Sequence, residues 1–525
     1  TFKLMRVVIR VDASIEIGLG HVMRCLTLAE ILKENGANVQ FITRKHKGNL
    51  INDIISKGFS VLELETSSSI KLDDKLPHSH LLGATQKQDA ECSIDFLKES
   101  RVDWLIVDHY GIDEDWQKYL KGNYQKLMVI DDLADRKHQC DILLDQTFGR
   151  QKKDYKDLVP GACELIVGSQ YALLRPEFRK WRQYSLDRRK HPIIRELLIN
   201  MGGIDNTKNI TTLVLEEIGN CNLPKDINIT IVIGAFSPHL ESIKVLAKEL
   251  PYRTDVKVNV GNLGEIMANS DISIGASGIA TWERCCLGLP TIQLVTANNQ
   301  FFLAETLSKH NIIKLVKNTS ELKRLLESAS DWTTDISISA KNICSGLGVY
   351  KIFNKLIDLK IDLDEFGEVK LENYVNTSKN DQTLTLKMRN HSEVRKFMFN
   401  QKEISEDSHM KFIQTLAERT DIRYFLVKRN KKVIGSINFS RINLHNSVEF
   451  GIYTNPFEKK NIAGRILEAA AIHYAFYELG VRKIKLKVLT NNDRAINFYK
   501  KSGFELINMK KVNKKDVFCM EKINN

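Results

Sequence analysis

Two successive series of short apolar runs, separated by segments with helical patterns, constrain what this chain can fold into more than any other feature. The first series lies at residues 6–11, 38–43, 60–65, 103–109 and 126–132. The second series lies at residues 195–203, 227–234, 256–260, 272–276 and 291–295. Strands that alternate with helices are typical of a parallel sheet covered by helices on both faces. The sequence therefore predicts an α/β protein with two doubly wound, Rossmann-like halves.

The pattern changes after residue 360. Closely spaced runs at 384–390, 423–429, 432–440 and 447–454 predict strands, and a long amphipathic helix, a strand at 482–489, a helix and a strand pair follow. The 525 residues are too many for one hydrophobic core, which stops growing at roughly 250–300 residues. We predict a first half at 5–165, a connector at 166–190, a second half at 191–360, a linker at 361–379 and an α+β domain at 380–525.

Charge and cysteine content narrow the class of protein. The formal net charge is +12, but basic and acidic residues are mostly interspersed. Such a surface suits phosphorylated ligands as well as nucleic acid, and because no nucleic-acid module accompanies it we expect no nucleic-acid partner. The nine cysteines are scattered, without a CxxC pair or a disulfide framework. We therefore expect a cytoplasmic protein without a bound metal.

Membrane spans and secretory signals are not expected. The longest apolar stretches, such as "IAGRILEAAAIHYAFYELG", carry charges and fall short of the ~20 apolar residues that a spanning helix needs. The chain opens directly into a strand-like run, without the pattern of a secretory signal. We expect no membrane partner, and the sequence leaves the oligomeric state open.

The stretch "GLGHVMRC" at residues 18–25 follows the first apolar run and opens a helical pattern that stops near Gly36. Gly18 and Gly20 allow the backbone to pass close to a ligand, and the first-turn N–H groups can meet an anion. His21 lies at the start of the predicted helix, where we expect it to act as a base. Arg24 is a further candidate for substrate binding. The alternative is that His21 only caps the helix or packs against the loop.

The second series contains two candidate phosphate loops. In "MGGIDNTKN", Gly202 and Gly203 separate a strand from a helix and can admit a pyrophosphate. In "GASGIATWERCCLGLP", Ser277 and Gly278 lead into a helix whose first turn can face a diphosphate. We therefore expect the second half to bind a phosphorylated ligand, without a metal ion.

These motifs together resemble a known family. "RVDAS", "GLGHVMRCLTLAE", "LLDQT", "YALLRPEF", "NMGG", "GASGIATWERCCLGLPTI" and "NNQ" occur in the order found in the UDP-sugar hydrolases of pseudaminic acid biosynthesis. Those enzymes release UDP from UDP-2,4-diacetamido-2,4,6-trideoxy-β-L-altropyranose. The resemblance covers residues 5–360 and implies a GT-B fold, similar to the transferase that adds N-acetylglucosamine in peptidoglycan synthesis.

The resemblance also implies roles for individual residues. It makes His21 the catalytic residue and places Glu283 on the ribose hydroxyls, with a solvated helix carboxylate as the alternative for Glu283. We expect Asp12, at the end of the first strand, to hold His21 or the attacking water. The sugar pocket is expected to include Tyr171, Asn299 and Gln300.

The C-terminal motif "NNDRAINFYKKSGFE" resembles the closing motif of the GNAT N-acetyltransferases. Asn492 and Tyr499 are seven residues apart on one predicted helix, which places both on the same face. The resemblance implies that Tyr499 protonates the departing thiolate of coenzyme A, a suitable task for a phenol. An ordinary core aromatic is the alternative for Tyr499. The cosubstrate is then acetyl-CoA.

The stretch "EKKNIAGRILEAA" corresponds to the GNAT pyrophosphate loop, Q/R-x-x-G-x-G/A, but departs from it. Asn461 stands where the first glycine is expected. The candidate acetyl-CoA contacts in this stretch are Lys459, Lys460, Asn461, Ala463, Gly464 and Arg465. The departure puts the individual phosphate contacts in doubt.

A further stretch, "LKMRNHSEVRKFMFNQKEISEDSHMKFI", resembles the acetyltransferase that modifies the 4-amino group of UDP-4-amino-4,6-dideoxy-N-acetyl-β-L-altrosamine. That resemblance covers residues 380–522. Glu449 in "SVEFGIY" is the candidate for taking the proton from the amine, with a strand-surface glutamate as the alternative.

The two resemblances support each other, because acetylation of the 4-amine makes the substrate from which the hydrolase removes UDP. The sequence thus predicts a bifunctional enzyme with a UDP-sugar and acetyl-CoA as its small-molecule partners. The alternative is a GT-B glycosyltransferase joined to a degenerate acyl-CoA-binding GNAT module.

Overall fold

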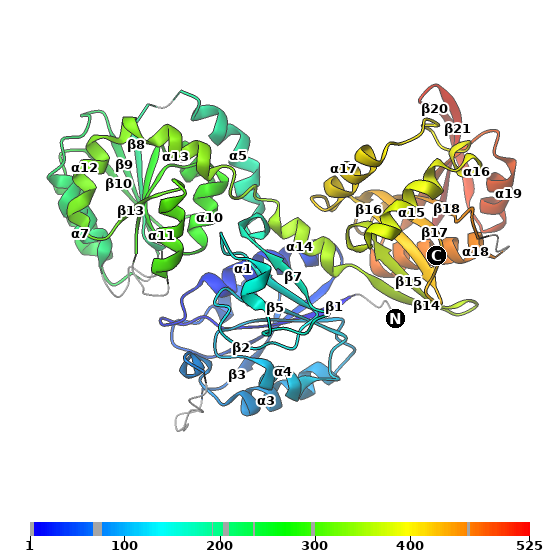
Figure 1. The fold of residues 1–525 in the computed structure, drawn as a ribbon, viewed down its shortest axis with the longest axis horizontal. Helices are drawn as coiled ribbons and strands as arrows, with labels where there is room; N and C mark the ends of the chain where they lie inside the picture. The colour runs from blue at the N-terminus through cyan, green and yellow to red at the C-terminus, as the bar shows by residue number, and fades with distance from the viewer. Residues whose placement is uncertain are drawn as a thin grey trace. The chain divides into compact units, whose positions relative to one another are not determined.

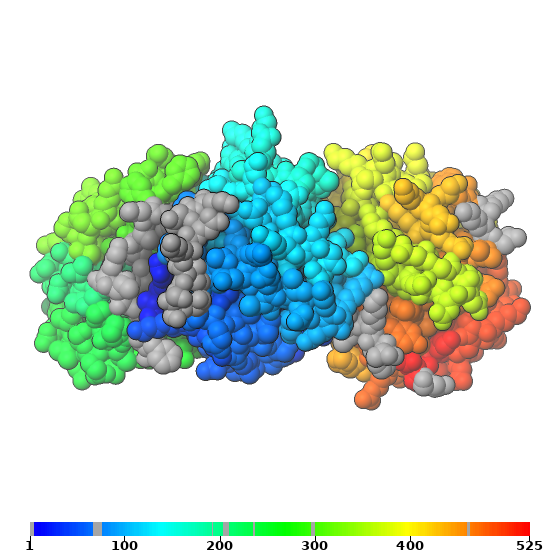
Figure 2. All heavy atoms as spheres, turned by 90° about the horizontal axis from the view of Figure 1, so that it is seen from below, coloured from blue at the N-terminus to red at the C-terminus, as the bar shows by residue number. Residues whose placement is uncertain are grey.

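The computed structural model describes residues 5–66, 76–191, 193–202, 209–234, 237–295, 300–458 and 462–524. The remaining stretches are drawn in grey in Figures 1 and 2. The chain forms two compact units, one of residues 8–28 and 40–349 and the other of residues 1–7, 29–39 and 350–525. No helix among the described residues is both long enough and apolar enough to cross a membrane.

The first sheet has seven strands in the order β3-β2-β1-β4-β5-β6-β7. The strands are β1 (Arg6–Val11), β2 (Asn38–Arg44), β3 (Ser60–Leu64), β4 (Trp104–Asp108), β5 (Lys126–Ile130), β6 (Ile142–Asp145) and β7 (Glu164–Val167). The helices are α1 (Gly20–Glu34), α2 (Ile51–Ser56), α3 (Gln86–Lys98) and α4 (Glu114–Leu120). Strands β1 and β4 are buried at every position, as is typical of parallel strands covered on both faces.

The second sheet has six strands in the order β10-β9-β8-β11-β12-β13. The strands are β8 (Glu196–Asn200), β9 (Asn228–Ile233), β10 (Arg253–Val258), β11 (Ile272–Ala276), β12 (Thr291–Leu294) and β13 (Lys314–Val316). Its helices lie on both sides of the sheet (Figure 1) and are α5 (Pro176–Arg188), α7 (Ile210–Gly219), α8 (Leu240–Glu249), α9 (Leu263–Asn269), α10 (Ile279–Cys286), α11 (Phe301–Lys309), α12 (Leu322–Glu327) and α13 (Thr333–Ala340). Leu197 and Ile199 pack in one core cluster and Leu198 in another, as alternation along β8 requires. The predicted pair of doubly wound halves is confirmed.

Each of these sheets has a point where the strand order reverses. In the first sheet β1 and β4 are neighbours, and in the second sheet β8 and β11 are neighbours. Loops that leave the carboxyl ends of two such strands turn to opposite faces, which opens a crevice where ligands bind in open α/β sheets. His21 follows β1, and Ser277 follows β11. The candidate residues of the sequence therefore lie where this fold binds ligands.

The third sheet has eight strands in the order β14-β15-β16-β17-β18-β19-β21-β20. The strands are β14 (Leu359–Leu363), β15 (Gly367–Asn373), β16 (Ile422–Arg429), β17 (Lys432–Asn443), β18 (Ser447–Thr454), β19 (Lys483–Leu489), β20 (Glu505–Val512) and β21 (Lys515–Ile523). The helices are α14 (Gly348–Leu356), α15 (Lys379–Asn390), α16 (Ser392–Arg395), α17 (Glu406–Leu416), α18 (Ala463–His473) and α19 (Asp493–Lys501), with a π-helical turn at Tyr474–Glu478.

Strands β18 and β19 run parallel but pair over only part of their length. The ladder joins residues 447–449 to residues 483–485, although β18 continues to Thr454 and β19 to Leu489. Both strands are fully described, and the structure shows no pairing between them beyond Glu449 and Lys485. The two strands therefore separate from that point. The predicted α+β architecture of this part is confirmed, and its central sheet contains one point where two parallel strands diverge.

The two faces of this sheet are covered by different helices. Leu426 and Val433 pack with Met388 of α15 and Ile413 of α17. On the other face, Phe450 of β18 contacts Tyr499 of α19, with ring centroids 6.0 Å apart. Because successive side chains of a strand alternate between faces, Glu449 and Phe450 point to opposite faces.

Three stretches differ from the predictions. Residues 384–390 were expected as a strand but lie in α15, whose N-cap Ser378 accepts a hydrogen bond from the Asp381 N–H. The expected linker, 361–379, contains most of β14 and all of β15. The expected connector, 166–190, contains α5. The alternation in "TLTLK" suits a strand, but Thr385 and Met388 are buried at helical spacing, and tertiary burial decides the structure.

Candidate functional site

The loop between β1 and α1 delivers His21 to the start of the helix. Gly18 N–H donates to the Ser14 carbonyl at 2.8 Å, and the Ser14 hydroxyl accepts from the backbone of Ile17 at 2.9 Å. Gly18 has φ +82°, a left-handed conformation that a side chain would strain. Helix α1 then begins at Gly20, as the sequence predicts within one residue.

The His21 ring is held by a carboxylate on the neighbouring strand. His21 Nδ1 lies 2.6 Å from Oδ1 of Asp108, the last residue of β4. The Tyr110 ring meets His21 edge-on, with centroids 4.6 Å apart. A carboxylate at Nδ1 favours the tautomer with the proton on that nitrogen, so Nε2 is left as a proton acceptor. Asp108 thus orients His21 for the work of a base.

Arg24 fixes the same carboxylate in turn. Its Nε lies 2.6 Å from Asp108 Oδ2, its Nη2 2.6 Å from Asp108 Oδ1, and its Nη1 3.1 Å from Asp132 Oδ2. Burial raises the pKa of Asp108, but the charges of Arg24 and His21 outweigh burial and hold that pKa well below its usual range. Arg24 was expected to bind substrate, whereas its guanidinium here binds two aspartates. Asp108 remains ionised beside the ring.

Asp12 was expected to hold His21 and instead belongs to a separate buried network. Arg10 donates to both of its oxygens, at 2.6 and 2.9 Å, and the Arg44 backbone N–H donates at 2.7 Å. The His109 ring lies 3.2 Å away. Burial raises the pKa of Asp12, but Arg10 first and His109 next lower it well below its usual range. The carboxylate that contacts His21 is therefore Asp108, and Asp12 supports the surrounding loops.

In the second half, Ser277 and Gly278 connect β11 to α10. The Ser277 hydroxyl accepts from Gln293 Nε2 at 2.7 Å. Gly278 has φ +132° and Gly202, after β8, has φ +67°. At both glycines a Cβ atom would meet no atom within 4 Å, so both loops border open space. This is the geometry that a loop needs to let a phosphate approach its backbone.

Helix α10 also faces the start of α1. A Cβ atom on Gly20 would lie 3.4 Å from Ile279 Cδ1, so the loop before α1 lies next to the start of α10. Glu283, on the same helix, is 8% exposed and lies 3.8 Å from Arg175 Nη2. Burial raises the pKa of Glu283, and Arg175 opposes this. The motifs of the two halves thus border one site.

Of the other residues predicted for the substrate pocket, the structure describes Tyr171 and Gln300. Tyr171 is half-buried in the short turn Ser169–Tyr171, and burial raises the pKa of its phenol. Gln300 is the residue before α11. Gly203 and Asn299 lie outside the described residues.

In the C-terminal part of the chain, Tyr499 of α19 is buried among aromatic rings. It is 7% exposed, and its ring centroid lies 5.5 Å from that of Phe504 and 6.0 Å from that of Phe450. Among the described residues its hydroxyl has no hydrogen-bond partner. Burial raises the pKa of Tyr499, and the nearby Glu468 raises it further. The phenol therefore stays protonated and free to donate.

Asn492 does not share a helix with Tyr499 as expected. Helix α19 begins at Asp493, and Asn492 is its N-cap, whose Oδ1 accepts from the Ala495 N–H at 3.2 Å. Asparagine is among the preferred N-cap residues because its side chain satisfies an otherwise unpaired helix N–H group. The carbonyl oxygen of Asn492 thus serves the helix.

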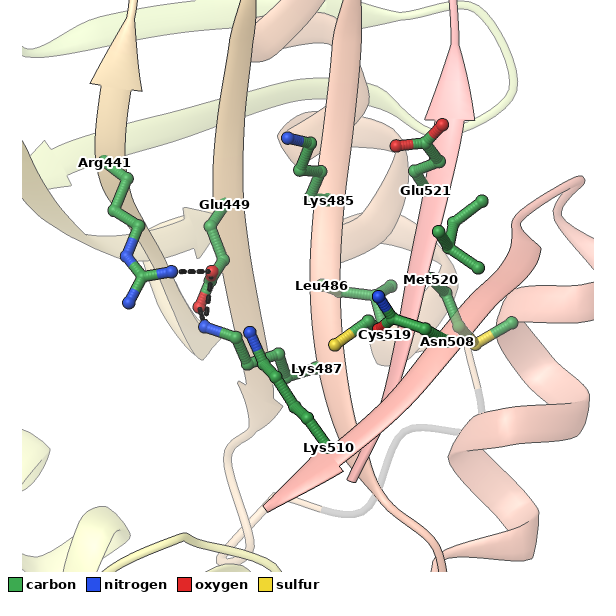
Figure 3. Close-up of a pocket in the computed structure, with 11 residues that line it drawn as sticks. Arg441, Glu449, Lys485, Leu486, Lys487, Asn508, Lys510, Cys519, Met520 and Glu521 are labelled. Carbon is green, nitrogen blue, oxygen red and sulfur yellow. Dashed lines mark hydrogen bonds and ion pairs between the residues drawn. The ribbon is translucent and has the colours of Figure 1, made fainter. Parts of the chain in front are cut away.

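Glu449 lines a cavity of ≈ 230 Å³ (Figure 3). Because Phe450 contacts Tyr499, alternation along β18 places Glu449 on the sheet face opposite Tyr499. Lys487 Nζ is 2.5 and 2.6 Å from the two carboxylate oxygens. Arg441 Nη1 is 3.3 Å from one of them. A substrate amine would therefore compete with Lys487 for this carboxylate.

The predicted acetyl-CoA loop is described only in part. Ala463 is the first residue of α18, and a Cβ atom on Gly464 would meet no atom within 4 Å. Arg465 pairs with Glu365 at 2.9 Å, so its guanidinium is engaged by the turn between β14 and β15. The other expected contacts, Lys459, Lys460 and Asn461, lie outside the described residues.

Metal binding has no candidate cluster in the described part of the chain. No group of three or more histidine, cysteine, aspartate or glutamate residues there is arranged to hold a metal ion.

The sequence matches known proteins on both parts. Residues 388–504 match the model of the acetyltransferase (GNAT) family. A UDP-2,4-diacetamido-2,4,6-trideoxy-β-L-altropyranose hydrolase of Campylobacter jejuni is 30% identical over 52% of this chain and 86% of that protein. The acetyltransferase PseH of the same species is 33% identical over 26% of this chain and 85% of that protein.

An uncharacterised protein of Methanocaldococcus jannaschii is 26% identical over 95% of this chain and 97% of its own length. Both parts therefore occur together in that chain too. Among solved structures, MurG of Acinetobacter baumannii aligns with 67% of this chain and 99% of its own, at a TM-score of 0.50 and 11% identity. That likeness shows the GT-B fold alone.

A GT-B fold with a histidine and carboxylate at its first switch point thus precedes a GNAT fold with a buried tyrosine. The chain is an enzyme that belongs to the UDP-2,4-diacetamido-2,4,6-trideoxy-β-L-altropyranose hydrolase family in its first part and to the PseH-type GNAT acetyltransferases in its last.

Proposed function

We propose that this chain carries out two consecutive steps on one UDP-sugar. The acetyltransferase part transfers an acetyl group from acetyl-CoA to the 4-amino group of UDP-4-amino-4,6-dideoxy-N-acetyl-β-L-altrosamine. The hydrolase part then releases UDP and yields 2,4-diacetamido-2,4,6-trideoxy-L-altropyranose.

One observation supports the order of steps most directly. The hydrolase relative is named for a sugar with two acetamido groups, and an acetyltransferase match lies in the same chain. A 4-amine is cationic near neutral pH, and burying a cation costs free energy that a neutral acetamide avoids. A hydrolase pocket for the diacetamido sugar therefore favours the acetylated form.

In the hydrolytic step, His21 Nε2 takes a proton from water while the water oxygen attacks the anomeric carbon. The bond from that carbon to the phosphate oxygen breaks, and its electron pair leaves with UDP. Asp108, 2.6 Å from Nδ1, stabilises the imidazolium that forms. The backbone N–H groups that follow Gly278 face the diphosphate, and Glu283 binds the ribose hydroxyls. Gly202 and Gly203 give the diphosphate room, while Tyr171, Asn299 and Gln300 border the sugar.

In the acetyl transfer step, the amine nitrogen attacks the thioester carbon and the carbon–sulfur bond breaks. Tyr499 donates its proton to the departing thiolate, a role that suits a buried tyrosine whose hydroxyl has no hydrogen-bond partner among the described residues. Glu449 accepts the proton of the amine, and the amine then takes the place of Lys487 beside this carboxylate. The loop from Lys459 to Arg465 holds the pyrophosphate of acetyl-CoA.

Mass spectrometry of the products tests this function. The wild-type chain is incubated with the UDP-4-amino-sugar and acetyl-CoA in water, without any sugar acceptor. We expect the free diacetamido sugar, UDP and coenzyme A in equal amounts. Acetylated UDP-sugar that accumulates without release of UDP would contradict the hydrolytic step and favour the glycosyltransferase alternative.

A further inference from the structure

The cavity beside Glu449 lies where strands β18 and β19 separate. It is lined by residues of β17, β18, β19, β20 and β21 (Figure 3). Its charged lining residues are Arg441, Glu449, Lys485, Lys487, Lys510 and Glu521. Four cations thus face two carboxylates across ≈ 230 Å³.

The charges in this cavity are not balanced by internal pairs. Lys487 and Arg441 share Glu449. Glu521 lies 3.9 Å from Lys483. Lys485 and Lys510 have no hydrogen-bond or ion-pair partner among the described residues. Lys485 is the cross-strand neighbour of both Glu449 and Glu521, so the lining as a whole carries four cations against two carboxylates. This excess of positive charge in a concave site attracts an anion with about two negative charges.

The position of the cavity identifies which substrate it meets. Phe450 contacts Tyr499 on one sheet face, and Glu449 opens into the cavity on the other. The thiolate of coenzyme A must reach Tyr499, whereas the amine must approach the acetyl group from the opposite direction. The gap between β18 and β19 is the place where the two can meet, because the ladder ends at Glu449 and Lys485.

We propose that this cavity binds the diphosphate of the nucleotide-sugar acceptor, through Lys485 and Lys510, beside the Glu449–Lys487 pair. This inference rests on the proposed acetyltransferase function. The volume is smaller than the ~300 Å³ of pockets that enclose a drug-sized ligand, so the cavity holds the diphosphate and not the whole acceptor.

A chemical footprint tests the cavity without requiring catalysis. Cys519 lines the cavity and is a free thiol. Its alkylation by iodoacetamide is measured by peptide mass spectrometry with and without inorganic pyrophosphate, and the exposed Cys92 is the internal control. We expect pyrophosphate to slow alkylation of Cys519 and not of Cys92 in the wild-type chain. The protection should be lost in Lys485→Gln and Lys510→Gln.

Steady-state kinetics then connect the cavity to the acceptor. Loss of the acetyl-CoA thioester is measured with the full chain at varied concentrations of the UDP-4-amino-sugar. In Lys510→Gln and Lys485→Gln we expect the KM for the acceptor to rise roughly 10-fold each, because a charged hydrogen bond to phosphate is lost, while kcat and the KM for acetyl-CoA stay unchanged. Lys511→Gln is the matched control, since that side chain lies on the other face of β20.

The outcomes separate this inference from the proposed function. A wild-type chain that shows the footprint but acetylates no UDP-sugar would remove the proposed function and keep the anion site. Acetylation that proceeds with unchanged acceptor KM in both lysine variants would overturn the inference and keep the function. Pyrophosphate that competes with acetyl-CoA and leaves Cys519 unprotected would likewise overturn it.

Discussion

His21 and Tyr499 are two of the groups proposed to transfer protons, and their surroundings in the chain are opposite in kind. His21 has a carboxylate 2.6 Å from Nδ1, and that carboxylate is bound by Arg24 on both oxygens. Tyr499 is packed between phenylalanine rings and its hydroxyl has no partner among the described residues. The contrast follows from the task of each group.

A base must present one defined nitrogen without a proton, and burial alone does not decide which nitrogen that is. Asp108 decides it for His21 by taking the other N–H. An acid must only keep its proton until the thiolate appears. Burial, which raises the pKa of Tyr499, is sufficient for that. A polar partner would instead compete with the thiolate for the proton.

Replacement of His21 should give the largest effect. In His21→Asn we expect UDP release to fall roughly 10² to 10⁴-fold, the range for general base catalysis, while acetyl transfer is retained. UDP and coenzyme A are quantified from the same reaction, so the acetyl transfer rate is the control for folding. Near-normal UDP release would remove His21 from the mechanism.

Tyr499→Phe should have the next largest effect, on the other activity. The ring and its contacts with Phe450 and Phe504 are kept, and only the proton donor is lost. We expect acetyl transfer to fall roughly 10²-fold while hydrolysis of the already acetylated UDP-sugar is unchanged. Coenzyme A release and UDP release from the two substrates measure this.

The same variant tests the order of steps. With the unacetylated UDP-sugar, acetyl-CoA should accelerate UDP release in the wild-type chain and hardly at all in Tyr499→Phe. Equal release with and without acetyl-CoA in the wild-type chain would contradict the consecutive reading, and would leave two independent enzymes in one chain.

Asp108→Asn should have a smaller effect on UDP release than loss of His21. The ring stays, but the amide no longer selects the tautomer or stabilises the imidazolium, so we expect kcat to fall by less than the roughly 10²- to 10⁴-fold loss for His21→Asn, with little change in KM. Asp132→Asn is the matched control, because Asp132 contacts Arg24 and not His21. An equal loss of UDP release in both variants would show that activity depends on the negative charge around Arg24 and not on the contact between His21 and Asp108.

The contact between Asp108 and His21 was not predicted from the sequence. The run "DWLIVDH" predicts β4, and "GLGHVMRC" predicts the start of α1 within one residue. Strand order is set by long-range pairing, and one sequence does not show that β4 lies beside β1. Asp12 is nearer to His21 in the chain and was therefore the natural candidate. The usable signal is an aspartate that ends a buried strand, once the reversal of strand order is known.

Local patterns failed in a different way in the C-terminal part. The alternation of "TLTLK" suits a strand, yet the stretch is helical because Ser378 caps it and Met388 packs on the sheet. Asn492 matched a motif position and proved to be a helix cap. Tyr499, by contrast, was singled out from a local motif that also contains one of its ring neighbours, Phe504. What sequence reasoning reaches therefore depends on whether the decisive contact is local.

The last prediction concerns stability, because the first half also buries titratable groups outside its candidate site. His138 is 1% exposed and its Nδ1 lies 2.9 Å from Gln117 Nε2. Burial lowers the pKa of His138 to about 4, with Asp131 opposing.

In the unfolded chain this imidazole titrates near pH ~6.5, so between about pH 6.5 and pH 4 the unfolded form binds more protons. The folded state is fully stabilised above that window and loses about 3 kcal/mol as pH falls through it. Peptide-resolved hydrogen exchange of residues 76–191 at the two ends of the window measures the loss. His138→Gln should reduce it and His191→Gln, at an exposed position, should not. The same slope in all three chains would assign the acid sensitivity of the first half to other groups.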